Sequence, residues 1–169
     1  MAVAAVVAVV AVGNRSLSKT IKSPQSDYRL RAFSLDETGE IFFTGGTAGG
    51  YGLLVLPQYS AKYLLGILNS KTLEWLVHQT ATQMHGGWFN YEARSIRNLP
   101  IVVAEGATHD RIVSLVEQML AAKRSLAAAR TDGDKRLYER MCASLDGQID
   151  ALVYQLYGLD EPDIALIEG

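Results

Sequence analysis

The sequence predicts an α+β fold, in which a small, mainly antiparallel sheet with short helices is followed by a long antiparallel helical hairpin. Three observations predict this class. Short runs of alternating apolar and polar residues, separated by glycine-rich breaks, occupy much of the chain before Pro57. The apolar residues then recur with the period of a helix. After Pro100, two long amphipathic stretches flank the short polar segment TDGD at 131–134.

The chain starts with MAVAAVVAVVAV, an apolar run rich in alanine and valine. The run is too short to span a bilayer. A signal peptide has a lysine or arginine before its apolar part, and none precedes this run. Because valine dominates and GNRS follows, we interpret the N-terminal segment 1–27 as a buried strand followed by a loop. An artefact of truncation or expression and a secretion signal are the alternatives.

The segment 28–104 is expected to form one domain that begins with strands. YRLRAFSL, IFFTG and YGLLVL have strand-like patterns, and DETGE and GTAGG supply the turns. The period then becomes helical, first at Tyr63, Leu64, Ile67 and Leu68 and again at Leu73, Leu76 and Val77. Asn69 and Ser70 interrupt it, so we expect two short helices, capped by Ser60 and Ser70.

The segment 105–169 is expected to form the helical hairpin and a short C-terminal helix. Thr108 is the candidate N-cap of the first long helix, whose apolar stripe comprises Ile112, Leu115, Val116, Met119, Leu120 and Leu126. The stripe of the second comprises Leu137, Met141, Leu145, Ile149, Leu152, Val153 and Leu156. Gly158 is placed to end that helix and Pro162 to start the last one. Such a hairpin either caps the sheet or serves as a spacer or docking arm.

Composition narrows the classes of function. The chain is 49% hydrophobic and 20% charged, which is ordinary for a globular protein. Its single cysteine, Cys142, argues against a disulfide framework and a C-x-x-C metal site and favours a cytoplasmic protein. The three histidines have no metal-ligand spacing, and the nucleotide, hydrolase and zinc-protease motifs are absent. We therefore assign no catalytic residue and no metal, and rank a small enzyme of unrecognised type last.

Charge is distributed unevenly along the chain. The net charge is −2, which argues weakly against a nucleic-acid binder. Residues 1–100, however, carry nine lysines and arginines against six acidic residues, whereas residues 101–169 carry seven against twelve. If a polyanion binds to this chain, the first part is where we expect it.

The stretch GGWFNYEARSIRNLP at 86–100 combines glycines, large aromatics and arginines. Arginine and lysine neutralise phosphates, arginine also pairs with guanine, and asparagine and glutamine have the amide geometry for adenine. Glycines allow close approach of the backbone, and aromatics supply apolar contact or support. The candidate DNA-binding residues are Lys71, Gln79, Gln83, Gly86, Gly87, Trp88, Asn90, Tyr91, Arg94, Arg97 and Asn98. The alternative is that the aromatics point inward from a strand and the arginines are solvated.

The succession YLLGILNSKTLEWLVHQTATQMHGGWFNYEARSIRNLPI at 63–101 resembles the TaqI-like C-terminal specificity domain of adenine-specific DNA methyltransferases and single-chain restriction-modification enzymes. In that family a helix reading LLGILNS leads to a second helix, a Gly-Gly-aromatic strand and a segment that ends on LP. The ending IDALVYQLYGLDEPDIALIE is similar to the tail of the same enzymes. The resemblance covers about residues 28–169, and type I restriction specificity subunits are the nearest family that could be confused with it.

The resemblance implies sequence-specific binding of double-stranded DNA by a target recognition domain at 28–104. Methyl transfer would then occur on a catalytic domain or subunit that binds S-adenosylmethionine, since this chain lacks the (D/N/S)PP(Y/F) catalytic motif and the glycine-rich cofactor loop. We therefore expect no enzyme activity of this chain alone, no cofactor in it and no membrane association. The strand Gly86–Phe89, with Asn90 and Tyr91 following, aligns with the region that relatives present towards DNA. The alternative is a type I specificity-like interaction module, whose hairpin recruits separate methylase and endonuclease chains.

Overall fold

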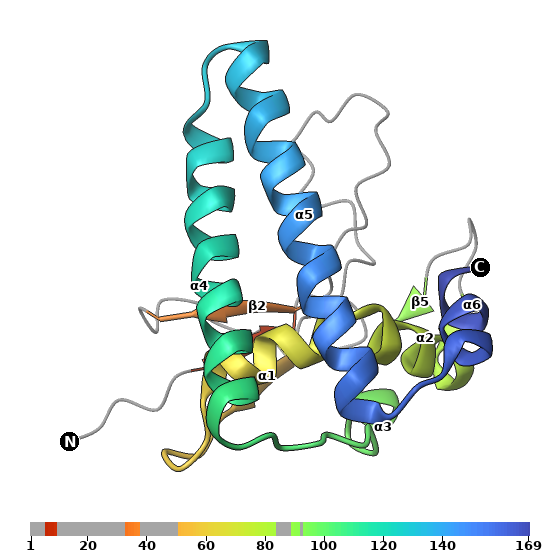
Figure 1. Ribbon diagram of the computed structural model, residues 1–169. Helices are drawn as coiled ribbons and strands as arrows, with labels where there is room; N and C mark the ends of the chain where they lie inside the picture. The colour runs from red at the N-terminus through yellow and green to blue at the C-terminus, as the bar shows by residue number, and fades with distance from the viewer. Residues whose placement is uncertain (1–5, 10–32, 38–50, 84–88, 92) are drawn as a thin grey trace. The chain divides into compact units, whose positions relative to one another are not determined.

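The computed structural model describes residues 6–9, 33–37, 51–83, 89–91 and 93–169 of the chain (Figure 1). Most of them lie in helices: α1 Ala61–Leu68, α2 Lys71–Thr80, α3 Ala93–Ile96, α4 Gly106–Ala128, α5 Asp132–Tyr157 and α6 Glu161–Glu168. The described strands are short: β1 Val6–Val9, β2 Phe33–Asp36, β3 Tyr51–Leu54, β4 Thr82–Gln83 and β5 Phe89–Asn90. Helices thus dominate the described part of the chain.

The chain divides into two compact units. Unit 1 comprises Met1–Pro57 and Leu76–Leu99, and unit 2 comprises Gln58–Trp75 and Pro100–Gly169. The boundary falls inside α2, so this helix contributes residues to both units. The units do not follow the expected division into 28–104 and 105–169, since residues 58–75 belong with the hairpin. The expected division into a recognition domain at 28–104 and a hairpin at 105–169 stays a prediction.

The long antiparallel hairpin predicted from the apolar periodicity is confirmed. In unit 2, α4 and α5 lie side by side and are joined by a short turn at one end, while α1 packs against both helices towards the other end (Figure 1). The core between these helices consists of Leu65, Ile67 and Leu68 of α1, Ile112, Leu115, Val116 and Ala122 of α4, and Cys142, Leu145, Ile149 and Val153 of α5. Burial of this apolar surface is the main force that holds the hairpin together.

The apolar stripe of α5 is narrower near the turn than expected. Leu137 and Met141 were assigned to the stripe, but 47% and 44% of their surfaces are exposed. Where only α4 and α5 meet, the small side chains of Ala122 and Cys142 fill the contact line and are buried. Leu137 and Met141 do not lie on this contact line. Because α1 packs against the other end of the hairpin, it does not bury them either.

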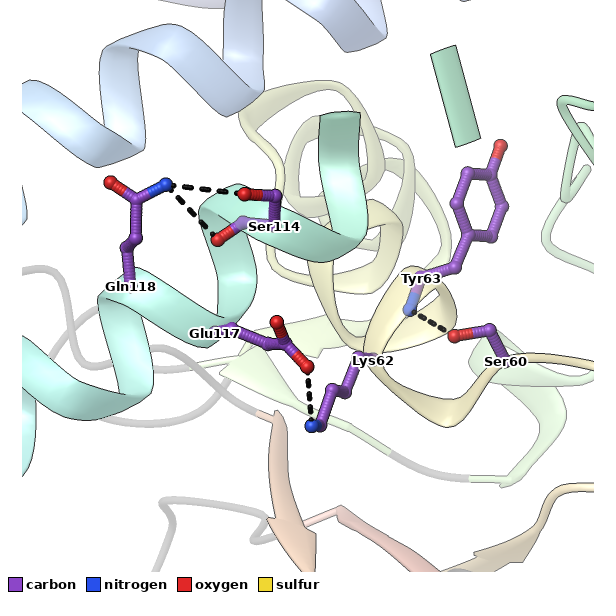
Figure 2. Close-up of polar contacts among 6 residues, drawn as sticks. All are labelled: Ser60, Lys62, Tyr63, Ser114, Glu117 and Gln118. Atoms are coloured by element: carbon purple, nitrogen blue, oxygen red, sulfur yellow. Dashed lines mark hydrogen bonds and ion pairs between the residues drawn. The ribbon is translucent and has the colours of Figure 1, made fainter. Parts of the chain in front are cut away.

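A glycine allows α1 to approach the hairpin closely. A Cβ atom added to Gly66 would lie 2.9 Å from Val116 Cγ2 and 3.0 Å from Ile112 Cγ2, closer than van der Waals contact permits. At the edge of the same contact, Lys62 Nζ donates to Glu117 Oε1 over 2.8 Å (Figure 2). Gly66 is thus the position at which α1 crosses α4.

Four of the predicted helix ends are confirmed, and one is wrong. Ser60 Oγ accepts a hydrogen bond from Tyr63 N (Figure 2), and Ser70 Oγ accepts one from Leu73 N. Gly158 ends α5 in the left-handed conformation, and Pro162 lies in the first turn of α6 after the Asp160 cap. Thr108, however, lies inside α4, which starts at Gly106 after Glu105. Gly106, the first residue of α4, has a φ of +60°, in the left-handed region that favours glycine.

Unit 1 contains the described strands. β1 pairs antiparallel with β2, from Val6 opposite Asp36 to Val9 opposite Phe33, and with β3, from Val6 opposite Leu54 to Val9 opposite Tyr51. Val6–Val9 is therefore extended, as the apolar run predicts. The described pairs are only two to four residues long, so a mainly antiparallel sheet across 28–57 stays a prediction. IFFTG lies outside the described residues.

Candidate nucleic-acid interface

The predicted DNA-facing strand belongs to a short strand pair in unit 1. β4 and β5 are antiparallel, with Thr82 opposite Asn90 and Gln83 opposite Phe89. The residues that connect them include Gly86, Gly87 and Trp88, which lie outside the described residues. The structure therefore places the two ends of the GGWFN stretch, and the contacts proposed for its glycines and its tryptophan stay predictions.

An aromatic cluster fixes β5 on the C-terminal half of α2. The His78 ring of α2 stacks on Phe89, with the centroids 3.9 Å apart and the planes at 15°. The Tyr91 hydroxyl lies 3.2 Å from His78 Nε2, and the Tyr91 and Phe33 rings are T-shaped, with their centroids 6.0 Å apart. Phe89 and Tyr91 are partly buried. These contacts give Tyr91 a supporting role, the second of the two roles considered for the aromatics.

The helical turn α3 holds two arginines at the surface. Its buried residues are Ser95, whose hydroxyl donates to the Thr80 carbonyl over 3.5 Å, and Ile96. Arg94 and Arg97 are three residues apart and both exposed, as neighbours on one face of a turn would be. Arg94 Nη2 donates to Thr82 Oγ1 over 2.6 Å, which orients the guanidinium next to β4.

The remaining polar candidates of unit 1 are also exposed. Gln79 precedes the last residue of α2, Gln83 ends β4, and Asn98 follows α3. Unit 1 thus contains the exposed side chains of Gln79, Gln83, Arg94, Arg97 and Asn98 and the backbone of Asn90. Amide and guanidinium groups are the donors and acceptors that base edges and phosphates require.

Lys71 belongs to unit 2, whereas the candidates above belong to unit 1. Its backbone N–H, at the start of α2, donates to Asp150 Oδ1 over 2.9 Å. Its ammonium lies 2.6 Å from Glu168 Oε1, which also accepts a hydrogen bond from the Tyr154 hydroxyl. A phosphate at Lys71 would therefore have to replace Glu168.

Two tyrosines that were not singled out hold the segment 100–104. Tyr157 donates to the Pro100 carbonyl over 2.6 Å and accepts from Val102 N, and Tyr63 donates to the Val102 carbonyl and accepts from Ala104 N. Burial is the main cause that raises the pKa of both Tyr63 and Tyr157 above 10.0. Tyr63 belongs to the motif YLLGILNS, and Tyr157 belongs to LVYQLYGL. These motifs are the only sequence signal that could have identified the two tyrosines.

Two of the motifs that carry the family resemblance, YLLGILNS and the C-terminal motif, belong to unit 2 with Pro100, whereas residues 86–99 belong to unit 1. Gly66 and Ser70 of YLLGILNS, Pro100 of the LP segment and Asp150 and Tyr157 of the C-terminal motif take part in the contacts above. These contacts give the motifs of unit 2 a structural role.

Among the residues that the structure describes, no three histidine, cysteine, aspartate or glutamate side chains gather in an arrangement suited to a metal ion. No described helix combines the length and the apolar character that crossing a membrane requires.

The sequence is similar to that of one characterised enzyme. It is 29% identical over 140 residues to the Type II restriction enzyme and methyltransferase RM.Eco57I of Escherichia coli. The aligned part covers 78% of this chain but 14% of that enzyme, so the chain spans a small fraction of its relative. No family model matches the chain. The similarity relates the chain to a restriction-modification enzyme, weakly and over a limited region.

Proposed function

We propose that this chain is the target recognition part of a restriction-modification DNA methyltransferase and binds double-stranded DNA at a specific sequence. Similarity to an enzyme named as both restriction enzyme and methyltransferase supports the class. The finer assignment, to the TaqI-like specificity domains, rests on the motifs at 63–70, 86–101 and 149–167. In this proposal methyl transfer and S-adenosylmethionine binding belong to a catalytic domain or subunit with which the chain associates.

The observation that carries the proposal is the exposed polar group of unit 1 around α3. Arg94, oriented by Thr82, and Asn90 on β5 are the proposed base-edge contacts, since arginine pairs with guanine and asparagine with adenine. Arg97 on the same face is a proposed phosphate contact, and Gly86 and Gly87 would allow close approach of the backbone. Lys71 is the second proposed phosphate contact, in exchange for Glu168.

An exposed apolar stripe from Ile112 to Leu126 would favour the interaction-module alternative. Ile112, Leu115 and Val116 are at most 3% exposed, and Met119, Leu120 and Leu126 are partly buried. Recruitment of separate chains by this face of the hairpin is therefore not favoured.

Selection of bound sites from a random pool of duplexes tests the proposed function. We expect one sequence to be enriched by the full chain, and Asn90→Ala or Arg94→Ala to relax the preference at individual base positions, with a loss of about 1–3 kcal/mol at the affected pair. Arg111→Gln, at an exposed arginine of α4 outside unit 1, is the matched control and should leave the selected sequence unchanged. The absence of any enriched sequence would contradict the proposal.

The salt dependence of binding tests the phosphate contact separately. Arg97→Gln should lower the slope of log K against log salt by about 0.9 for every duplex alike, because one phosphate contact is lost. The Arg111→Gln slope should equal that of the wild type. Binding to duplex DNA that does not change with salt would count against the assignment of Arg97.

A further inference from the structure

The tip of the helical hairpin is basic, although the rest of unit 2 is acidic. Of the seven lysines and arginines after residue 100, six lie between 123 and 140: Lys123, Arg124, Arg130, Lys135, Arg136 and Arg140. The same stretch has three acidic residues, which gives it a net charge of +3. The remainder of 101–169 has one arginine and nine acidic residues, a net charge of −8. The positive charge is therefore confined to one end of the hairpin.

The basic side chains of this hairpin tip, residues 123–140, are accessible. All six are exposed. Lys135 lies 3.8 Å from Asp132, a long and solvent-exposed pair, and Asp134 is engaged with the Thr131 hydroxyl at the start of α5. No ion pair joins Arg124, Arg130, Arg136 or Arg140 to a carboxylate within the described part of the chain. Four guanidinium groups thus remain available to an external anion.

The hairpin connection brings these charges together. Because α4 and α5 are antiparallel and pack along their length, the last two turns of α4 and the first two of α5 are neighbours (Figure 1). With a rise of about 1.5 Å per residue, the six side chains lie within roughly 12 Å of the turn along the helix axes. Arg136 and Arg140 are four residues apart and so share one face of α5.

We propose that the hairpin tip binds the phosphate backbone of duplex DNA, independently of sequence. This inference rests on the proposed function of the chain. Arginine, which supplies four of the six charges, forms paired hydrogen bonds with phosphate oxygens. Duplex DNA carries about one negative charge per 1.7 Å of its axis, so a tip of this size faces several phosphates. Such contacts raise the affinity for every sequence alike and leave base recognition to unit 1.

Neutralising the tip without disturbing the helix tests this inference. In Arg136→Gln/Arg140→Gln, both substitutions keep a good helix former at an exposed position of α5. The matched control is Arg111→Gln, an exposed arginine on α4 far along the helix from the turn. The affinity of the full chain for a random-sequence duplex and for its selected site is measured from low to physiological salt.

We expect the slope of log K against log salt to fall by about 1.8 for the double variant on both duplexes, because two phosphate contacts of about 0.9 each are lost. The ratio of specific to non-specific affinity should not change, and Arg111→Gln should behave as the wild type. Unchanged slopes and affinities in the double variant would overturn the inference, whereas retained sequence selection in the same experiment would leave the proposed function standing.

The remaining outcomes also decide the matter. If the wild-type chain binds no duplex at any salt concentration, both the inference and the proposed function are overturned. If it binds vesicles containing phosphatidylserine through Arg136 and Arg140 but not duplex DNA, the tip is a membrane-binding surface and the inference is wrong.

Discussion

At the scale of residues, the hydroxyl groups of Tyr63 and Tyr157 hold the segment 100–104 in place. Each of them donates one hydrogen bond and accepts another, and the N–H and C=O of Val102 are both satisfied in this way. Tyr63 is also stacked on His109 at 4.9 Å. Because residues 100–105 belong to no helix or strand, these side chains replace the partners that secondary structure would supply.

Removal of the Tyr157 hydroxyl should destabilise the protein. Tyr157→Phe loses the bonds to Pro100 and Val102, and we expect the free energy of unfolding to fall by about 1–2 kcal/mol. Urea denaturation measures this change. Tyr138→Phe, at a tyrosine of α5 outside this contact, is the control and should be neutral. A Tyr157→Phe protein as stable as the wild type would show that the two bonds contribute nothing.

The same tyrosines predict a dependence of stability on alkaline pH. An unfolded tyrosine ionises near pH 10, whereas burial raises the pKa of Tyr63 and Tyr157 in the folded protein. Above pH 10 the folded state therefore retains more protons than the unfolded state, so the free energy of unfolding falls as the pH rises. Well below pH 10 both tyrosines are protonated in the folded and in the unfolded state, so they do not contribute to the pH dependence of stability. Denaturation at pH 8 and pH 10.5 should show a smaller loss for Tyr63→Phe/Tyr157→Phe than for the wild type, and an equal loss would refute the argument.

Two glycines of unit 2 should respond in opposite directions to the same substitution. Gly66→Ala gains helix propensity but places a methyl group against Val116 and Ile112, whose branched side chains are buried and restricted in a helix. We expect a net loss of about 1–2 kcal/mol. Gly147→Ala on α5 meets no atom within 4 Å and should gain about 0.5–1 kcal/mol. Thermal unfolding compares them, and a stabilising Gly66→Ala would show that α1 can move away from α4 without cost.

Local sequence patterns predicted most of the helix ends, but they did not predict the contacts of Lys71. Ser60, Ser70, Gly158 and Pro162 act through neighbours within four residues, so their roles follow from the sequence alone. The partners of Lys71 are Asp150 and Glu168, which are 79 and 97 residues away. No local pattern contains this information, and a lysine next to a basic segment was therefore read as a phosphate contact.

At the scale of elements, α5 caps α2 through a side chain. Asp150 is only 3% exposed, and its Oδ1 accepts the hydrogen bond from Lys71 N, one of the N–H groups that the first turn of α2 leaves without a helical partner. A carboxylate at this end of a helix also interacts favourably with the helix dipole. The start of α2 therefore depends on α5, in addition to its own cap at Ser70.

Replacement of Asp150 should separate hydrogen bonding from charge. Asp150→Ala removes the acceptor from a buried position, and we expect a loss of about 1–3 kcal/mol in the free energy of unfolding. Asp150→Asn keeps an acceptor oxygen and should lose less. Chemical denaturation compares both with Asp146→Ala, one turn earlier on α5. Equal stability of all three variants would contradict capping by Asp150.

The elements themselves were predictable to different degrees. The apolar periods at 112–126 and 145–156 predicted both long helices, because helix formation reflects residues three and four apart. Leu137 and Met141 continue the same period but are exposed, since burial depends on what packs against a helix. The strand partners of Val6–Val9 are residues 33–36 and 51–54, a pairing that no local pattern specifies.

At the scale of the whole molecule, the candidate site could be located from the sequence but not assembled. Composition drew attention to 86–100, and the structure places the exposed Arg94, Arg97 and Asn98 on and after α3. Gln83 lies on β4, whose antiparallel pairing with β5 is a tertiary feature that no local pattern specifies. The net charge of 101–169 is negative, so the charge of the whole segment does not indicate the basic residues at the hairpin tip.

The chain passes between the units three times, and under the proposed function this bears on how the recognised DNA sequence could change. Residues 76–99 interrupt the sequence of unit 2, entering within α2 and leaving at Pro100. On the unit 2 side, Asp150 anchors Lys71 before the interruption, and Tyr63 and Tyr157 anchor residues 100–104 after it. A recombination event that replaces only the gene segment for 76–99 preserves these anchors. The arrangement therefore favours the exchange of a short inserted segment between genes over the transfer of a complete domain.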